Sequence, residues 1–314
     1  MTPEERLQLA AMAQELFAAG RAEDVVSDLA GSGLADEVWA DAEATAGLFE
    51  QHGLHAATSR LLDHAVLRPS AGEMPGRVVH PLLGTAVTPG CRTGGRVVVD
   101  GVVLNATGEL GDCAVAVDDG RVVLVGEGRL TAVPHLGFDP DLAVARVRGE
   151  VAEADVRELR LSTDEITVRV ARAVAFELLG IAEAAIERAK LHVIERHQFG
   201  RPLGAFQVVR HRLASAQIAT SGARELALAT DDTVSADVAR LIVKAVAGRA
   251  ALLAVGEAQQ VCGGMGFTAE FGLHRLVRRA YLLDSLLGGS ESAEFDLGEL
   301  AMAGQYVPDR LVAL

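Results

Sequence analysis

The chain has 314 residues, half of them apolar, and its 29 basic and 43 acidic side chains give a formal net charge of −14. This length is enough for a large hydrophobic core and for two or three domains. The acidic balance argues against a general nucleic-acid binder, which needs a broad basic face. It leaves room for an anionic ligand, because a few local arginines can bind a phosphate group.

No run of about 18 uncharged apolar residues occurs in the sequence, so no transmembrane helix is expected. The N-terminal segment MTPEERLQLAAMAQELF lacks the basic start, apolar centre and cleavage site of a signal peptide, which predicts a cytoplasmic protein. Cys91, Cys113 and Cys262 lie far apart and form no CxxC motif. We expect them to be reduced core residues and not disulfide or metal ligands.

Residues 1 to about 68 carry a helical pattern. An apolar stripe marks the first expected helix: Leu7, Ala10, Ala11, Leu16 and Phe17. Residues 40–67 predict two further helices, separated at Gly53. The breaker cluster RPSAGEMPG, residues 68–76, predicts the end of an N-terminal helical domain over residues 1–76.

Residues 77–160 change character to short β-branched runs, RVVVDGVVL, CAVAV, RVVLVG and LAVARVRG. The dipeptides Asp100-Gly101 and Asp119-Gly120 are candidate hairpin turns between such runs. The pattern predicts a small antiparallel β domain.

Residues 161–314 return to helix. Ser162 or Thr163 can cap a long helix that runs to about His197. A second helix is expected to end near Leu228, a third to run from near Ser235 to about Val261, and a short one to span Ala269 to Leu287. The fold class is therefore α+β, mostly α, with a helical domain, a small β domain and a C-terminal helical bundle.

The segment RHQFGRPLGAFQ spans a helix–turn–helix corner. Arg196 and Gln207 lie eleven residues apart at its two ends, so the turn can bring both side chains to one side. Arginine binds phosphate oxygens in a bidentate way, and glutamine adds an orienting hydrogen bond. On composition alone, a solvated Arg196 beside a corner packed with Phe199 and Phe206 is the more common explanation.

The segment QQVCGGMGF begins at the end of an expected helix. Its three glycines permit unusual backbone dihedrals and let a ligand approach the main chain. Such a loop is more often a helix stop than a cofactor loop. It is neither a P-loop nor a GxGxxG fingerprint, because no GK[ST] and no preceding strand are present.

Together, in this order and spacing, RHQFGRPLGAFQ and QQVCGGMGF resemble the acyl-CoA dehydrogenase superfamily. The similarity continues through GFTAEFGLHRLVRRA to LLGGS and covers about residues 165–290. It implies a shortened helical N-domain, a truncated antiparallel β middle domain and a C-terminal four-helix bundle, with FAD held at a subunit interface.

The resemblance also implies roles for individual residues. Arg196 and Gln207 match residues that reach the FAD of a neighbouring subunit, and Phe199 matches an aromatic residue packed near it. Gln260, Gly263 and Gly264 match a loop that lines the dinucleotide. Gln198 and Gly200 lie within the first segment and complete the expected cofactor-binding set.

The sequence departs from the family pattern at the catalytic base. Family members remove the α-proton of an acyl-CoA with a glutamate, placed in one of two positions that correspond here to Leu287-Gly288 and to Val170. Neither position holds a carboxylate. Glu177, Asp284 and Glu291 are the weak substitutes, with Glu177 the first choice.

A second departure is the length before residue 160. No segment like T-E-x-x-x-G-S-D or W-x-T-N-G is present, and these segments cradle the isoalloxazine ring and thioester in the family. The two losses resemble the short, base-lacking subunit of actinobacterial α2β2 acyl-CoA dehydrogenases of steroid catabolism. That similarity implies a longer acyl-CoA dehydrogenase partner, a bulky acyl-CoA substrate, no metal and no membrane.

Two other interpretations stay open at the level of sequence. The chain could be a self-sufficient homomeric dehydrogenase or flavin oxidase that uses another acid, such as Glu177. It could also be a non-enzymatic scaffold that keeps the bundle for assembly.

Overall fold

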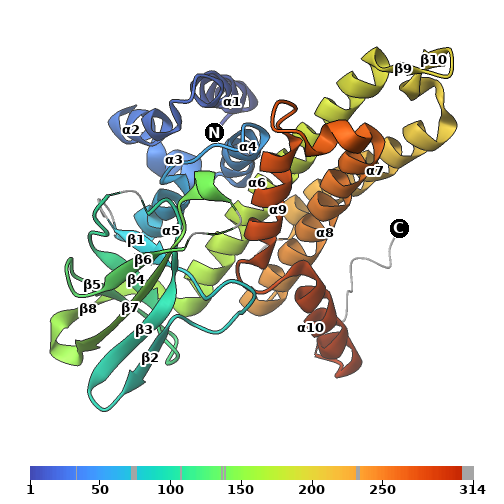
Figure 1. Ribbon diagram of the computed structural model, residues 1–314. Helices are drawn as coiled ribbons and strands as arrows, with labels where there is room; N and C mark the ends of the chain where they lie inside the picture. Colours follow the sequence, from blue (N-terminus) through green and yellow to red (C-terminus); the bar gives the residue numbers. More distant parts are fainter. Residues whose placement is uncertain are drawn as a thin grey trace.

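The computed structural model describes residues 1–32, 34–71, 76–106, 108–135, 137, 139–230 and 234–305. A group of short helices from the N-terminal part lies against the long helices of the C-terminal part, and a β region lies beside both (Figure 1). The α+β, mostly α fold expected from the sequence is confirmed.

Five helices form the N-terminal region: α1 Pro3–Ala18, α2 Ala22–Ser32, α3 Ala35–Ala40, α4 Ala42–Leu54 and α5 Leu61–Ala71. Thr2 caps α1 and forms a capping box with Glu5, and the Asp41 carboxylate caps α4 by accepting from Ala44 N at 2.9 Å. The sequence pattern did not predict α2 and α3. The signal was present in α2 and was overlooked, because Ala22, Val25, Val26 and Leu29 recur at helical spacing and are buried.

Two details of this region were predicted wrongly. The buried stripe of α1 consists of Leu9, Ala13, Leu16 and Phe17, whereas Leu7 is 72% exposed. Helix α5 also continues past the expected break to Ala71. Residues 72–75 of the breaker cluster lie outside the described residues, so the boundary at residue 76 stays a prediction.

The β region contains two four-stranded sheets, in the orders β1-β4-β5-β8 and β2-β3-β7-β6. The strands are β1 Arg77–Val79, β2 Gly90–Thr93, β3 Arg96–Val103, β4 Cys113–Ala116, β5 Arg121–Val125, β6 Thr131–Pro134, β7 Ala145–Ala152 and β8 Val156–Ser162. All neighbouring strands pair antiparallel except β1 and β4, which are parallel. Buried valines from both sheets form a core of their own.

One of the two predicted hairpin turns is correct. Asp119-Gly120 turns the chain between β4 and β5, with Gly120 at φ +86°. Asp100-Gly101 instead lies inside β3, where a Cβ on Gly101 would meet the His80 carbonyl oxygen at 2.4 Å. The β2–β3 hairpin turns at Gly94-Gly95, so the glycine at position 101 reflects close packing.

The C-terminal region consists of α6 Thr163–Glu195, α7 Gln207–Ala229, α8 Ala236–Cys262, α9 Leu273–Ser285 and α10 Ser290–Met302. Ser162 caps α6 and forms a capping box with Glu165. The expected caps and lengths of α6, α7 and α8 are confirmed to within about two residues. Helix α9 is shorter than predicted, and α10 was missed.

Helices α6 to α9 pack together as the four-helix bundle, and α10 lies against α8. The N-terminal helices share one hydrophobic core with this bundle. Helix α4 crosses α6 closely, because a Cβ on Gly180 would come within 2.0 Å of the Glu50 carbonyl oxygen. Among the described residues, no helix has the length and hydropathy needed to span a membrane. Cys113 and Cys262 are buried as expected, but Cys91 is exposed.

Candidate functional site

The first motif forms a tight corner at the far end of the bundle (Figure 1). Arg196 ends α6, and a two-residue ribbon of β9 His197–Gln198 and β10 Arg201–Pro202 leads through a 3₁₀ turn to α7. Phe199 and Gly200 make the ribbon's turn at φ +54° and +77°. The conformation at Phe199 is uncommon for a residue with a side chain.

Neither aromatic residue of the corner enters the core, because Phe199 is exposed and Phe206 is only half-buried. The Phe199 and Phe206 rings meet edge to face with 6.1 Å between centroids, and the Arg201 guanidinium lies 4.0 Å from the Phe206 centroid. Phe199 remains 88% exposed. A large apolar ring held at the surface in an uncommon backbone conformation favours an external contact over a packed corner.

The second motif follows α8 as a 3₁₀ turn, Gly263–Phe267. Gly263 begins it at φ +57°, and neither Gly263 nor Gly264 has a heavy atom within 4 Å of the position of a Cβ. The space over both glycines is therefore open to a ligand. Four residues after this turn, the ring centroid of Phe271 lies 5.4 Å from that of His192 in α6. Arg188 of α6 donates to the Phe271 carbonyl oxygen.

These contacts bring the two motifs to the same end of the bundle, because His192 precedes Arg196 by one helical turn. All eight residues of the expected cofactor-binding set are exposed: Arg196, Gln198, Phe199, Gly200, Gln207, Gln260, Gly263 and Gly264. A guanidinium, three primary amides and accessible main chain at the glycines fit a dinucleotide phosphate and its polar neighbours. A ligand here would approach from outside the chain.

The two expected base positions converge elsewhere in the molecule. Val170 of α6 and Leu287, just after α9, line one small cavity of about 30 Å³. Both side chains are buried, with 2% and 6% of their surface exposed. The cavity has room for about one water molecule. Leu287 and Gly288 have φ values of +59° and +84°. Neither apolar side chain can accept a proton.

Glu177, the first substitute acid, belongs to a buried ionic network. Its Oε1 atom lies 3.2 Å from His52 Nδ1 and 3.6 Å from Arg279 Nη1. Arg279 also pairs with Asp139 at 2.5 Å and donates to the Ala57 carbonyl oxygen. Burial alone would raise the pKa of Glu177, but His52 and Arg279 hold it below its ordinary value.

The other two substitutes are also unsuited to catalysis. Asp284 accepts a hydrogen bond from Ser290 N at 3.2 Å and so caps α10. The Lys244 ammonium donates to the Leu283 and Asp284 carbonyl oxygens near the end of α9. Glu291 is exposed in the first turn of α10.

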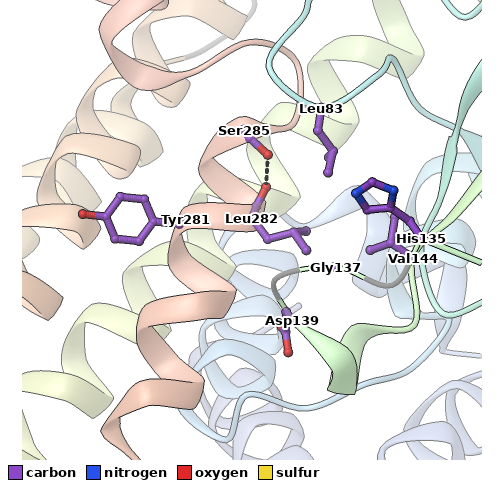
Figure 2. A pocket seen from close by; sticks show the side chains of 8 residues that line it. All are labelled: Leu83, His135, Gly137, Asp139, Val144, Tyr281, Leu282 and Ser285. Carbon is purple, nitrogen blue, oxygen red and sulfur yellow. Dashed lines mark hydrogen bonds between the residues drawn. The ribbon is translucent and has the colours of Figure 1, made fainter. Parts of the chain in front are cut away.

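A larger cavity, of about 290 Å³, lies between the β region and α9. Figure 2 shows Leu83 and His135 facing Leu282 and Ser285 across it. Asp139, the partner of Arg279, is part of its wall. The sequence did not predict the His52, Asp139 and Arg279 network, because its members come from three regions far apart in the chain and share no motif.

Comparison with known proteins agrees with this geometry. Residues 167–298 match the family model of the acyl-CoA dehydrogenase C-terminal domain. Acyl-CoA dehydrogenase IpdE2 of Mycobacterium tuberculosis is 28% identical over 89% of the chain and 92% of its own length. Acyl-CoA dehydrogenase FadE34 of the same organism is 28% identical over 68% of the chain, which spans only 33% of that relative.

Among solved structures, the Tcur3481-Tcur3483 steroid ACAD G363A variant is similar with a TM-score of 0.77 and 23% identity, over 96% of this chain and 99% of that one. The ChsE4-ChsE5 complex of Mycobacterium tuberculosis is similar with a TM-score of 0.74 and 18% identity, over 96% and 98%. These likenesses establish the fold. Residues 167–298 therefore belong to the acyl-CoA dehydrogenase C-terminal domain family, and the chain is similar to an acyl-CoA dehydrogenase over nearly its whole length.

Proposed function

We propose that the chain is a subunit of a heteromeric, FAD-dependent acyl-CoA dehydrogenase and completes the FAD site of a longer partner without supplying the catalytic base. One contrast carries the proposal. The eight flavin-contacting residues lie exposed at one end of the bundle, whereas both base positions are buried and apolar. Such a chain can hold a cofactor that belongs largely to another subunit.

In this assignment Arg196 binds the cofactor diphosphate, and Gln207 and Gln260 orient its polar groups. Gly263 and Gly264 let the cofactor approach the main chain. Bound FAD would accept the β-hydride of the acyl-CoA. The α-proton goes to a carboxylate of the partner, because Val170 and Leu287 have no basic atom.

The relatives support the proposed substrate class. One similar structure is named a steroid dehydrogenase and another is a complex of two differently named chains. We therefore propose that the complex α,β-dehydrogenates a bulky CoA thioester, with a steroid-derived acyl group as the first candidate. An α2β2 assembly in the cytoplasm is the arrangement that this proposal entails.

The self-sufficient alternative needs Glu177 as the base. Its carboxylate is 4% exposed and already pairs with His52 and Arg279, so it has neither access to a substrate nor a raised proton affinity. The scaffold alternative predicts that Arg196 and the glycine turn contact no cofactor. The open, uncommon backbone at Phe199 and Gly263 argues against it.

The test uses the chain co-expressed with a candidate acyl-CoA dehydrogenase-like partner. A charge-assisted bond to a diphosphate contributes roughly 1.5–3 kcal/mol. Arg196→Ala should therefore weaken FAD retention by about ten- to a hundredfold, measured by equilibrium dialysis of the complex. Arg21→Ala, at an exposed arginine that pairs with Asp24 in the N-terminal region, is the control and should retain FAD normally. Equal retention in both variants would favour the scaffold.

A further inference from the structure

A third cavity, of about 390 Å³, lies between the N-terminal helices and the bundle, and its lining includes none of the eight expected cofactor-binding residues and neither base position. Its walls come from α3, α4, α5, α6 and α7. They consist of Trp39, Ala40, Ala42, Thr45, Ala65, Arg169, Arg172, Ala173, Phe176, Ala227, Leu228 and Thr230. We call it the Trp39 cavity.

The Trp39 cavity faces a different side of α6 from the base cavity. Arg169, Arg172, Ala173 and Phe176 recur at three- and four-residue spacing and so share one stripe of the helix. Val170 points with Ile166 and Thr167 into the small base cavity instead. A ligand in the Trp39 cavity would therefore not occupy the position of an acyl group at the flavin.

Two buried polar atoms of the wall, Trp39 Nε1 and Arg172 Nε, have no hydrogen-bond partner, although Arg172 is bonded through Nη2. The indole N–H of Trp39 is buried and has no hydrogen-bond partner. A buried donor without an acceptor costs about 1–3 kcal/mol, and native proteins seldom keep one without a reason. The hydroxyls of Thr230 and Thr45 in the wall already donate to the Leu226 and Val38 carbonyl oxygens. They therefore do not compete with the Trp39 N–H for an acceptor in the cavity.

Two arginines give the cavity positive charge. Arg169 Nη1 donates to the Val66 carbonyl oxygen and Arg172 Nη2 to the Thr230 carbonyl oxygen, each at 2.9 Å. Glu165 Oε1 lies 3.9 Å from Arg169 Nη2. A guanidinium group has five N–H donors and can bind an anion in addition to a backbone carbonyl. The remaining wall is apolar, with the Trp39 and Phe176 rings and several alanines.

We propose that the Trp39 cavity binds a small amphipathic carboxylic acid, distinct from the acyl-CoA substrate. The carboxylate would accept from the Trp39 indole N–H and pair with Arg169 or Arg172. The compact apolar body of the acid would lie against Phe176, Leu228 and the alanines. The volume suits a compact acid and excludes a whole CoA thioester. This site goes beyond the proposed flavin function and does not depend on it.

Trp39 is the single tryptophan of the chain, so its fluorescence reports on this cavity directly. The full chain is titrated with 3-phenylpropionate, and with 3-phenylpropan-1-ol as a neutral molecule of similar shape. We expect a saturable change in Trp39 emission with the acid and at least tenfold weaker binding of the alcohol. Equal affinity for the two, or no saturable change, would overturn the proposal.

Variants then separate the contributions to binding, which is read by calorimetry. Arg169→Gln or Arg172→Gln should weaken acid binding about tenfold, and Trp39→Phe about three- to tenfold. Arg240→Gln is the matched control, because Arg240 is a mostly buried arginine in another cavity of the chain. Ala42→Leu fills the Trp39 cavity without changing its charge and should abolish binding. Acid binding that survives Ala42→Leu would refute the site.

A last arm distinguishes a free acid from a carboxylate of another subunit. The same titration is repeated by calorimetry on the co-expressed complex. Retained acid binding, still lost on Ala42→Leu, supports a small-molecule site. Loss of acid binding in the complex would mean that the partner covers or fills the cavity, and the proposal would fail.

Discussion

Polar groups are arranged in opposite ways at the end of the bundle that carries the two motifs and in the buried centre of the molecule. At the end, eight residues with donors or accessible backbone face outward, including a phenylalanine that is 88% exposed. In the centre, Glu177, His52, Arg279 and Asp139 lie within ion-pair distance of one another below the surface. Groups at the end are available to another molecule, whereas the central charges are committed to joining three parts of this chain.

The same difference helps to distinguish a catalytic charged residue from a structural one. A carboxylate on α6 invites a catalytic interpretation, but the contacts of Glu177 make it a structural ion. The positions where a base is expected, Val170 and Leu287, meet in a cavity too small for a substrate. Charge alone is therefore a poor guide to catalysis without access and pairing.

The largest predicted effect breaks the central network. Arg279→Met removes a cation that is 1% exposed and leaves Asp139 and Glu177 buried without it. Loss of one partner of a buried ion pair costs about 3–5 kcal/mol. Urea unfolding should show a decrease of this size in the free energy of unfolding. Arg249→Ala, which breaks an exposed pair with Glu294, should cost less than about 1 kcal/mol. Similar costs for both would mean that the network does not bind the regions together.

A second, smaller effect concerns Lys244 beneath the loop that follows α9. Burial lowers the pKa of Lys244 from 10.5 to about 8. Between these values the unfolded chain binds more protons than the folded one, so the free energy of unfolding rises with pH. The wild type should gain on the order of 1–3 kcal/mol relative to Lys244→Met as pH increases from about 8 to 10. Denaturant titrations at several pH values measure this difference, and parallel curves for the two proteins would contradict it.

The smallest effect belongs to the exposed end. Gln207→Ala removes one exposed amide, so the stability of the chain should change by less than about 0.5 kcal/mol. FAD affinity of the complex should fall about fivefold, the equivalent of one ordinary hydrogen bond of about 1 kcal/mol. Gln217→Ala, farther along the same helix and bonded to Glu183, should leave FAD affinity unchanged. If only Gln217→Ala weakened FAD binding, the position assigned to the cofactor at the start of α7 would be wrong.

Local patterns predicted much of the fold. Ser162 with Glu165, and Ser235 with Asp237, marked helix starts correctly because capping chemistry is read from neighbouring residues. The dipeptide Asp100-Gly101 was predicted wrongly, because Gly101 is required by the approach of His80, just after β1, and not by a turn. Helix α10 was missed because its start is capped from Asp284, in the preceding helix.

The candidate site also has parts that local sequence patterns predict and parts that they do not. The two motifs and the empty base positions could be located from sequence, because each is a local run of residues. The Glu177 network could not, since its partners are distant in sequence and meet only after three regions pack. The Trp39 cavity was equally inaccessible, because five helices contribute its walls.

We propose that this chain forms one wall of a flavin site that another chain completes. The most direct measurement is the amount of FAD per heterodimer in the co-expressed complex, from flavin absorbance and quantified subunits. We expect one FAD per pair, lost on Arg196→Ala, and a colourless chain when it is expressed alone. Two FAD per pair, or a yellow chain alone whose flavin is reduced by an acyl-CoA, would contradict it.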